Sequence, residues 1–207
     1  MANDKKFELV IFDMDGVILR SDLLYYEIAR QINTEINYTD LSCGISQGGK
    51  ILFKSIFGDN YTEKNINWFR KMQVKAFNRN THLYEDIHEI ITNVSKYYKL
   101  AMVSNKPVAC IEGILKDINL YDLFNIIVGR DSGHGVKPQP DGLNHVIKNM
   151  KVEKNKVIYF GDAISDYHAC IKAGITFAHC KYGFDESIVE CKYVLSKTEE
   201  IRDILDL

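Results

Sequence analysis

The sequence predicts an α/β protein, with a doubly wound parallel sheet and an inserted α-helical segment. Along residues 84–207, apolar runs of strand length alternate with segments in which apolar residues recur at helical spacing. That alternation is typical of strand–helix–strand units. Between residues 21 and 83, strand-like runs are scarce and helical spacing dominates. We therefore expect an α/β core formed by residues 1–20 and 84–207, and a helical cap formed by residues 21–83.

The first strand is expected at Phe7–Phe12, a run that is mostly apolar and partly β-branched. Such a run is typical of a strand buried on both faces, with helices above and below the sheet. It ends abruptly in the sequence Asp13-Met-Asp-Gly16. In open α/β sheets, ligands bind beyond the carboxyl ends of the strands. Two carboxylates therefore stand where a ligand site is expected.

The helices of the insert are predicted from apolar residues that recur three or four positions apart. These residues are Leu23, Leu24, Ile28 and Ile32, then Ile51, Leu52 and Ile56, and then Trp68, Phe69, Met72 and Phe77. Polar stretches at Thr39–Gly49 and Gly58–Thr62 are expected to interrupt the helices.

The remaining strands of the sheet are expected after residue 84. They are predicted at Leu100–Val103, Phe124–Val128, Val157–Phe160, Thr176–Ala178 and Tyr193–Leu195. The intervening helices carry recognisable ends: a capping box of Asp86 and Glu89, Pro107 in a first turn, and Gly174 as a stop. A further helix is expected at Asp141–Met150. This order implies parallel strands joined by helical crossovers.

Composition and charge exclude several classes of protein. Of the 207 residues, 46% are hydrophobic and 26% charged, and the formal net charge of −2 provides no basic footprint for nucleic acid. No apolar run approaches the roughly 20 residues that a membrane span requires. The five cysteines include no Cys-x-x-Cys pair, and their odd number argues against a disulfide framework. We expect a cytoplasmic protein that binds neither nucleic acid nor membrane.

Four polar clusters each follow a predicted strand or precede a predicted helix. They are Asp13 with Asp15, Ser104 with Asn105, Lys137 with Pro138, and Gly161-Asp162 with Asp166. Because a parallel sheet gathers its carboxyl ends on one edge, we expect these clusters to meet. Each cluster alone is commonplace in turns, helix caps or solvated surfaces. Their order and their common position favour a single site.

Phosphoryl transfer is the chemistry that this set of residues suits, because it needs mainly positioning and charge stabilisation. Asp13 can act as a nucleophile that accepts the phosphoryl group covalently. A carboxylate that attacks a phosphate dianion meets like-charge repulsion, so a cation is required. Asp162 and Asp166, one helical turn apart, can hold Mg²⁺ together with Asp13.

The other clusters supply proton transfer and phosphate binding. Asp15, in a sharp turn made possible by Gly16, can protonate the leaving oxygen and later deprotonate the attacking water. Lys137 offers a fixed positive charge to the phosphate. Ser104 and nearby backbone N–H groups can donate to its oxygens. We therefore expect Gly16, Ser104, Asn105 and Lys137 to line the substrate site.

The four motifs, in this order, resemble those of the haloacid dehalogenase-like hydrolases. The resemblance spans the whole chain, and the insert looks like the cap of the phosphoglycolate phosphatase and β-phosphoglucomutase branch. It implies a Rossmann-like core, with Asp13 as nucleophile and Asp15 as acid/base that also ligates Mg²⁺ through its backbone carbonyl. It implies phosphoryl binding by Ser104 and Lys137, with acidic metal ligands at Asp162 and Asp166, and a monomer or homodimer.

Within this resemblance, the leading prediction is a Mg²⁺-dependent phosphatase acting on a small phosphorylated metabolite. A phosphomutase of the β-phosphoglucomutase kind remains open, because it would use the same Asp13 and Asp15. A non-catalytic phosphate-binding module is disfavoured, since all four polar groups are kept. Arg20 and Lys50 are candidate substrate contacts from the cap, and Lys50 or Lys54 would be the lysine of a phosphonatase. The substrate itself stays open.

Overall fold

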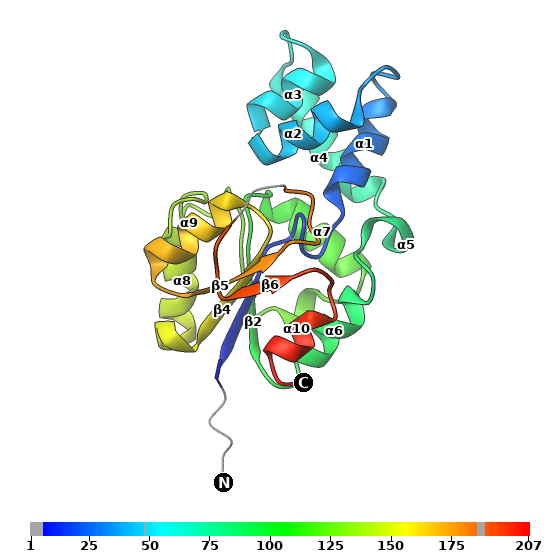
Figure 1. Ribbon diagram of the computed structural model, residues 1–207. Coiled ribbons are helices and arrows are strands. Elements are labelled where there is room, and N and C mark those ends of the chain that lie inside the picture. Colours follow the sequence, from blue (N-terminus) through cyan, green and yellow to red (C-terminus); the bar gives the residue numbers. More distant parts are fainter. Residues whose placement is uncertain (1–5, 48, 186–188) are drawn as a thin grey trace. The chain divides into compact units, whose positions relative to one another are not determined.

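The computed structural model describes residues 6–47, 49–185 and 189–207 of the chain (Figure 1). The chain divides into two compact units, one formed by Met1–Leu19 with Tyr84–Leu207 and the other by Arg20–Leu83. This division lies within one residue of the core and insert boundaries expected from the sequence. Among the described residues, none of the helices has the length and apolar content needed to cross a membrane.

The larger unit is built on a six-stranded sheet in which every neighbouring pair is parallel. Its strands are β1 (Leu9–Phe12), β2 (Lys99–Val103), β3 (Ile126–Val128), β4 (Val157–Gly161), β5 (Thr176–Cys180) and β6 (Tyr193–Leu195). They lie in the order β3-β2-β1-β4-β5-β6. The order reverses between β1 and β4, which is where a doubly wound sheet opens a crevice for ligands. The predicted fold class is confirmed.

Helices cover both faces of this sheet (Figure 1). They are α6 (Ile87–Val94), α7 (Val108–Asp117), α8 (Asp141–Met150), α9 (Ile164–Ala173) and α10 (Glu200–Ile204), with single 3₁₀ turns at Tyr121–Leu123 and Lys154–Lys156. Helices α8 and α9 pack against each other on one face, and α6 contacts α10 on the other. The central strands β1 and β4 are therefore buried on both sides, as their continuous apolar sequences predict.

The core follows the alternation of side chains along each strand. Leu9 and Ile11 of β1 point toward α8 and α9, where they join one buried cluster with residues such as Leu143 and Ala169. Phe12 points to the opposite face and stacks on Phe160 at 5.3 Å between ring centroids. Because β1 is central and wholly buried, the residue that follows it is held rigidly.

The smaller unit is built from helices joined by short loops, and none of the sheet's strands lies in its described residues. It contains α1 (Ser21–Arg30), α2 (Tyr38–Gln47), α3 (Gly49–Phe57), α4 (Glu63–Lys75) and α5 (Arg79–His82). Its centre is aromatic: the ring of Phe69 lies 5.2 Å from Tyr25, 5.8 Å from Phe53 and 6.4 Å from Phe57, each edge-to-face. Thr62 caps α4 through a reciprocal box with Asn65.

Two local predictions are wrong. The polar stretch expected at Thr39–Gly49 is helical in its described part, with Gly48 outside the described residues. The side chain of Asn37 accepts a hydrogen bond from the N–H of Thr39 at 2.7 Å, and Leu41 is fully buried. This hydrogen bond at the start of the helix and the burial of Leu41 stabilise the helix despite its polar composition. Asp86 forms no capping box, because its left-handed φ of 55° is incompatible with the extended conformation of a capping residue.

Candidate active site

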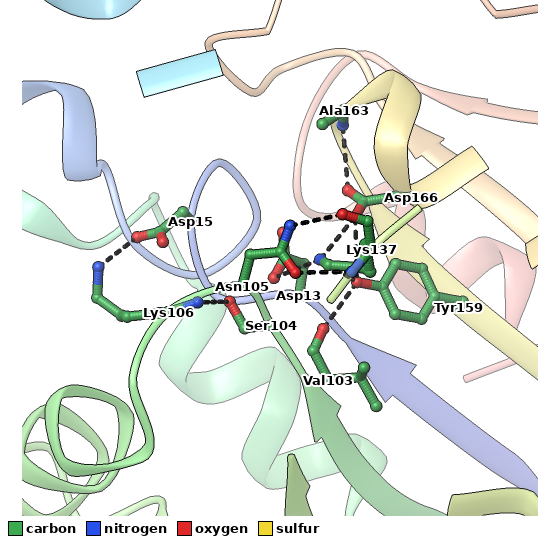
Figure 2. A network of polar contacts seen from close by, with 10 residues as sticks. All are labelled: Asp13, Asp15, Val103, Ser104, Asn105, Lys106, Lys137, Tyr159, Ala163 and Asp166. Atoms are coloured by element: carbon green, nitrogen blue, oxygen red, sulfur yellow. Dashed lines mark hydrogen bonds and ion pairs between the residues drawn. The ribbon is translucent and has the colours of Figure 1, made fainter. Parts of the chain in front are cut away.

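The carboxyl edge of the sheet gathers the polar clusters expected there. Asp13 directly follows β1, and its N–H donates to the carbonyl of Phe160 on β4 at 2.9 Å. Ser104 follows β2 and is bound in the same way to the carbonyl of Val128 on β3, also at 2.9 Å. Both side chains are thereby fixed at the ends of central strands. Figure 2 shows them converging with Lys137 and Asp166.

Lys137 lies at the centre of this group and is almost fully buried. Its Nζ contacts Asp13 Oδ1 at 3.0 Å, Asp166 Oδ1 at 2.6 Å and the hydroxyl of Tyr159 at 2.7 Å (Figure 2). Burial lowers the pKa of Lys137, but the charges of Asp13 and Asp166 outweigh burial and raise it above its ordinary value. Lys137 is therefore a permanent cation beside Asp13.

Asn105 holds the loop that carries Lys137. Its side-chain oxygen accepts from the Lys137 N–H at 2.9 Å, and its side-chain nitrogen donates to the Lys137 carbonyl at 3.1 Å. This two-point contact positions the lysine through its backbone. The contact with substrate that the sequence predicts for Asn105 stays a prediction.

Asp13 is buried among charges of both signs. Its pKa is raised to about 7: burial is the largest cause and the charges of Asp166 and Asp15 act in the same direction, whereas Lys137 and a hydrogen bond from Ser104 oppose the rise. The pKa of Asp162 is raised well above its ordinary value by burial and by the charges of Asp166 and Asp13. Crowding of buried carboxylates therefore makes this site costly to ionise unless a further cation is present.

Three of the crowded carboxylates fit a divalent metal ion. One oxygen each of Asp13, Asp162 and Asp166 lies within 4.8 Å of the others, and all three residues are buried. When they are ionised, three negative charges against the one of Lys137 leave a formal charge of −2. Asp13 Oδ1 is buried, with the ammonium of Lys137 3.0 Å away. Hard oxygen ligands and this charge suit Mg²⁺.

Gly16 makes the approach of two of these segments possible. It closes a tight turn in which its N–H donates to the Leu19 carbonyl at 2.9 Å, and its φ is +77°. A Cβ at this position would lie 1.9 Å from Asp162 Oδ2. Any side chain would therefore displace the Asp162 carboxylate, in addition to straining the backbone.

We expect Gly16→Ala to lower the free energy of unfolding by about 2 kcal/mol more than Gly133→Ala and to reduce catalysis sharply. Gly133 is a matched control in the same unit, because it has the same φ of +77° and a Cβ there meets nothing within 4 Å. The difference between the two variants in urea denaturation measures the clash with Asp162 alone. An equal loss of unfolding free energy in both variants would mean that the Asp162 side chain moves away from the new methyl group without destabilising the fold.

Two residues of the site were not predicted from the sequence. Tyr159 lies on β4 within an apolar run, yet its hydroxyl donates to the Val103 carbonyl at 2.8 Å and accepts from Lys137. Lys106 directly follows the Ser104-Asn105 pair, and its Nζ donates to Asp15 Oδ1 at 2.7 Å. The position of Lys106 beside a polar motif was a usable signal, whereas a tyrosine in a strand gives none.

Arg20, Lys50 and Lys54 belong to the helical unit. The pKa of Tyr38 is raised to about 12 by burial and by Asp22, and the positive charge of Arg20 opposes that rise. Lys54 forms an exposed ion pair with Asp59 at 2.7 Å, and Lys50 is exposed on α3. Their contacts with a substrate stay predictions.

Comparisons with known proteins agree with the geometry of the site. A family model described as haloacid dehalogenase-like hydrolase matches residues 10–180, which contain all four polar clusters. The resemblance inferred from these motifs is confirmed.

Individual relatives cover almost the whole chain. A phosphoglycolate phosphatase of Aquifex aeolicus is 26% identical over 205 residues, which are 96% of each chain. The crystal structure of a predicted phosphoglycolate phosphatase from Haemophilus somnus superposes with a TM-score of 0.81 at 20% identity, covering 98% of this chain and 99% of that one. A protein described as a β-phosphoglucomutase from Thermotoga maritima superposes with a TM-score of 0.74 at 24% identity, covering 97% and 99%. At these identities the solved structures establish the shared fold.

Proposed function

Since this chain belongs to the haloacid dehalogenase-like hydrolase family, we propose that it is a Mg²⁺-dependent phosphatase acting on a small phosphorylated metabolite. The observation that carries the proposal is the buried group formed by Asp13, Asp162 and Asp166, of which Asp13 and Asp166 contact the buried ammonium of Lys137. This group presents a nucleophile, a set of metal ligands and a fixed positive charge at one edge of the sheet.

The reaction begins at Asp13. One of its carboxylate oxygens attacks phosphorus, so that an Asp13–phosphorus bond forms while the bond to the leaving oxygen breaks. Asp15 gives its proton to that leaving oxygen. Lys137 and the hydroxyl of Ser104 stabilise the charge on the phosphoryl oxygens. Asp13, Asp162 and Asp166 would hold Mg²⁺, which would supply neutralisation of the negative charge at the site.

The second half of the reaction restores the enzyme. Water attacks the phosphorus of the phosphoaspartate while Asp15 takes one of its protons. The bond between phosphorus and Asp13 breaks, and inorganic phosphate leaves. Asp15 is then protonated again and Asp13 is again a carboxylate, so protons and electrons balance over the cycle.

The class of substrate is proposed from the relatives and from the inserted unit. The Aquifex aeolicus relative is a phosphoglycolate phosphatase that matches along nearly the whole chain. We assign the helical unit, Arg20–Leu83, as a cap that selects small substrates, with Arg20 and Lys50 as its candidate contacts. A cap that excludes bulk water favours metabolites over phosphoproteins.

The test is phosphate release from a panel of phosphorylated metabolites, including phosphoglycolate, sugar phosphates, nucleoside monophosphates and pyrophosphate. We expect release with Mg²⁺ and a loss of at least about 100-fold in EDTA, restored by added Mg²⁺, because the carboxylate group then lacks its cation. Release that is unchanged in EDTA would contradict the metal assignment. Isomerised sugar phosphates without release would point to the phosphomutase alternative instead.

A further inference from the structure

Lys106 and Asp15 form an ion pair beside the proposed nucleophile. Lys106 Nζ lies 2.7 Å from Asp15 Oδ1 (Figure 2). The Lys106 side chain is completely buried, whereas 21% of the Asp15 side chain is exposed. The lysine thus approaches the carboxylate from within the protein, and the carboxylate remains accessible to a substrate.

Both partners are held by their backbones. The Lys106 N–H donates to Ser104 Oγ at 3.3 Å, and its carbonyl accepts from the Arg130 N–H at 3.1 Å. A Cβ on Gly129 would lie 2.7 Å from that carbonyl, so a glycine is needed for this close approach. Asp15 lies in the turn in which the N–H of Leu19 donates to the Met14 carbonyl at 2.9 Å. The pair joins two loops that are fixed independently.

A buried ammonium is costly unless a charged partner accompanies it. Lys137 already meets Asp13 and Asp166, and Lys106 meets a different carboxylate at 2.7 Å. The site therefore contains two buried lysines with separate partners. One faces the proposed nucleophile and the other faces the proposed acid/base.

We propose that Lys106 is a positioning residue for Asp15: its ammonium holds the Asp15 carboxyl group where that group transfers a proton to the leaving oxygen. The inference rests on the proposed function, in which Asp15 is the acid/base. A general acid must lie within hydrogen-bond reach of the oxygen that it protonates. Without Lys106, the Asp15 side chain gains rotational freedom, and this geometry is populated less often.

The test uses leaving groups that differ in their need for a proton. An alkyl phosphate leaves as a strongly basic alkoxide unless it is protonated, whereas p-nitrophenyl phosphate releases a stable anion. For Lys106→Met we expect kcat/KM to fall about 30-fold with the alkyl phosphate, equivalent to about 2 kcal/mol. With p-nitrophenyl phosphate we expect less than a threefold change. Because kcat/KM reports formation of the phosphoaspartate, the later attack of water does not enter the comparison.

Control variants separate positioning from folding. Lys106→Arg keeps the charge and should recover part of the activity with the alkyl phosphate. This variant also keeps the proposal testable if Lys106→Met folds poorly. Lys116→Met removes the same side chain from an exposed ion pair with Glu112 and should leave both substrates unaffected. In the double variant with Asp15→Asn, loss of Lys106 should cost little more, because the group that it positions is gone.

The outcomes distinguish the inference from its premise. Equal losses with both substrates in folded Lys106→Met, or no loss with either, would overturn the positioning role. If Asp15→Asn itself loses no more activity with the alkyl phosphate than with p-nitrophenyl phosphate, then Asp15 is not the acid and the proposed mechanism fails first. A large alkyl-selective loss in Asp15→Asn together with a smaller alkyl-selective loss in Lys106→Met supports both.

Discussion

Asp13→Asn is expected to reduce phosphate release by about 10⁴-fold or more, with the fold retained. An amide cannot form the acyl phosphate on which the proposed reaction depends, and removal of a covalent nucleophile leaves only the assistance of the surrounding groups. Asparagine has nearly the shape of aspartate, so the buried position beside Lys137 can accept it. The measurement is the initial rate with the best substrate of the metabolite panel, in excess Mg²⁺.

A second measurement on the same variant identifies the covalent step. Acid quenching during turnover should trap a phosphorylated protein with the wild type and none with Asp13→Asn. The exposed carboxylate of Asp117, at the end of α7, provides a matched control, and Asp117→Asn should retain full activity and labelling. Labelled Asp13→Asn protein, or turnover at the wild-type rate, would show that another residue is the nucleophile.

The position of the site can be predicted because few sheet topologies are compatible with the order and the apolar character of the predicted strands. Continuous apolar strands such as β1 require helices on both faces, and parallel strands bring their carboxyl ends to one edge. Once the strand preceding Asp13 and the strand preceding Asp162 belong to one such sheet, their carboxylates must be close. The clustering of Asp13, Asp162 and Asp166 within 4.8 Å reflects this geometry. The helix Asp141–Met150 also has the predicted bounds, since its apolar stripe is strong.

The details that escaped prediction depend on contacts between distant segments. Nothing local marks Tyr159 as different from its apolar neighbours, and its role appears only when Lys137 reaches its hydroxyl from another loop. Lys106 pairs with Asp15, which lies 91 positions earlier, so the spacing of apolar residues along the sequence does not indicate this contact. The same holds for α2, whose helical state depends on burial of Leu41 more than on its polar composition.

The crowding of carboxylates also predicts how stability depends on pH in the metal-free protein. Burial raises the pKa of Asp13 from 3.8 to about 7. Between these values the folded protein retains a proton that the unfolded chain releases, so the free energy of unfolding falls as pH rises through this range and levels off above pH 7. In EDTA, the wild type should therefore lose about 3 kcal/mol relative to Asp13→Asn between pH 5 and pH 8.

Added Mg²⁺ should reverse this loss at pH 8 in the wild type, because the ion binds the ionised carboxylates of the folded protein and not those of the unfolded chain. Asp13→Asn and Asp162→Asn each remove one of the three clustered ligands and should show a much smaller rise in the free energy of unfolding on addition of Mg²⁺. Urea denaturation at pH 5, 6, 7 and 8, with EDTA and with Mg²⁺, measures both effects, with Asp117→Asn as the exposed control. If the wild type and Asp13→Asn keep the same difference in unfolding free energy at every pH, then Asp13 is ionised in the folded protein without cost, and the site has no electrostatic need for a metal ion.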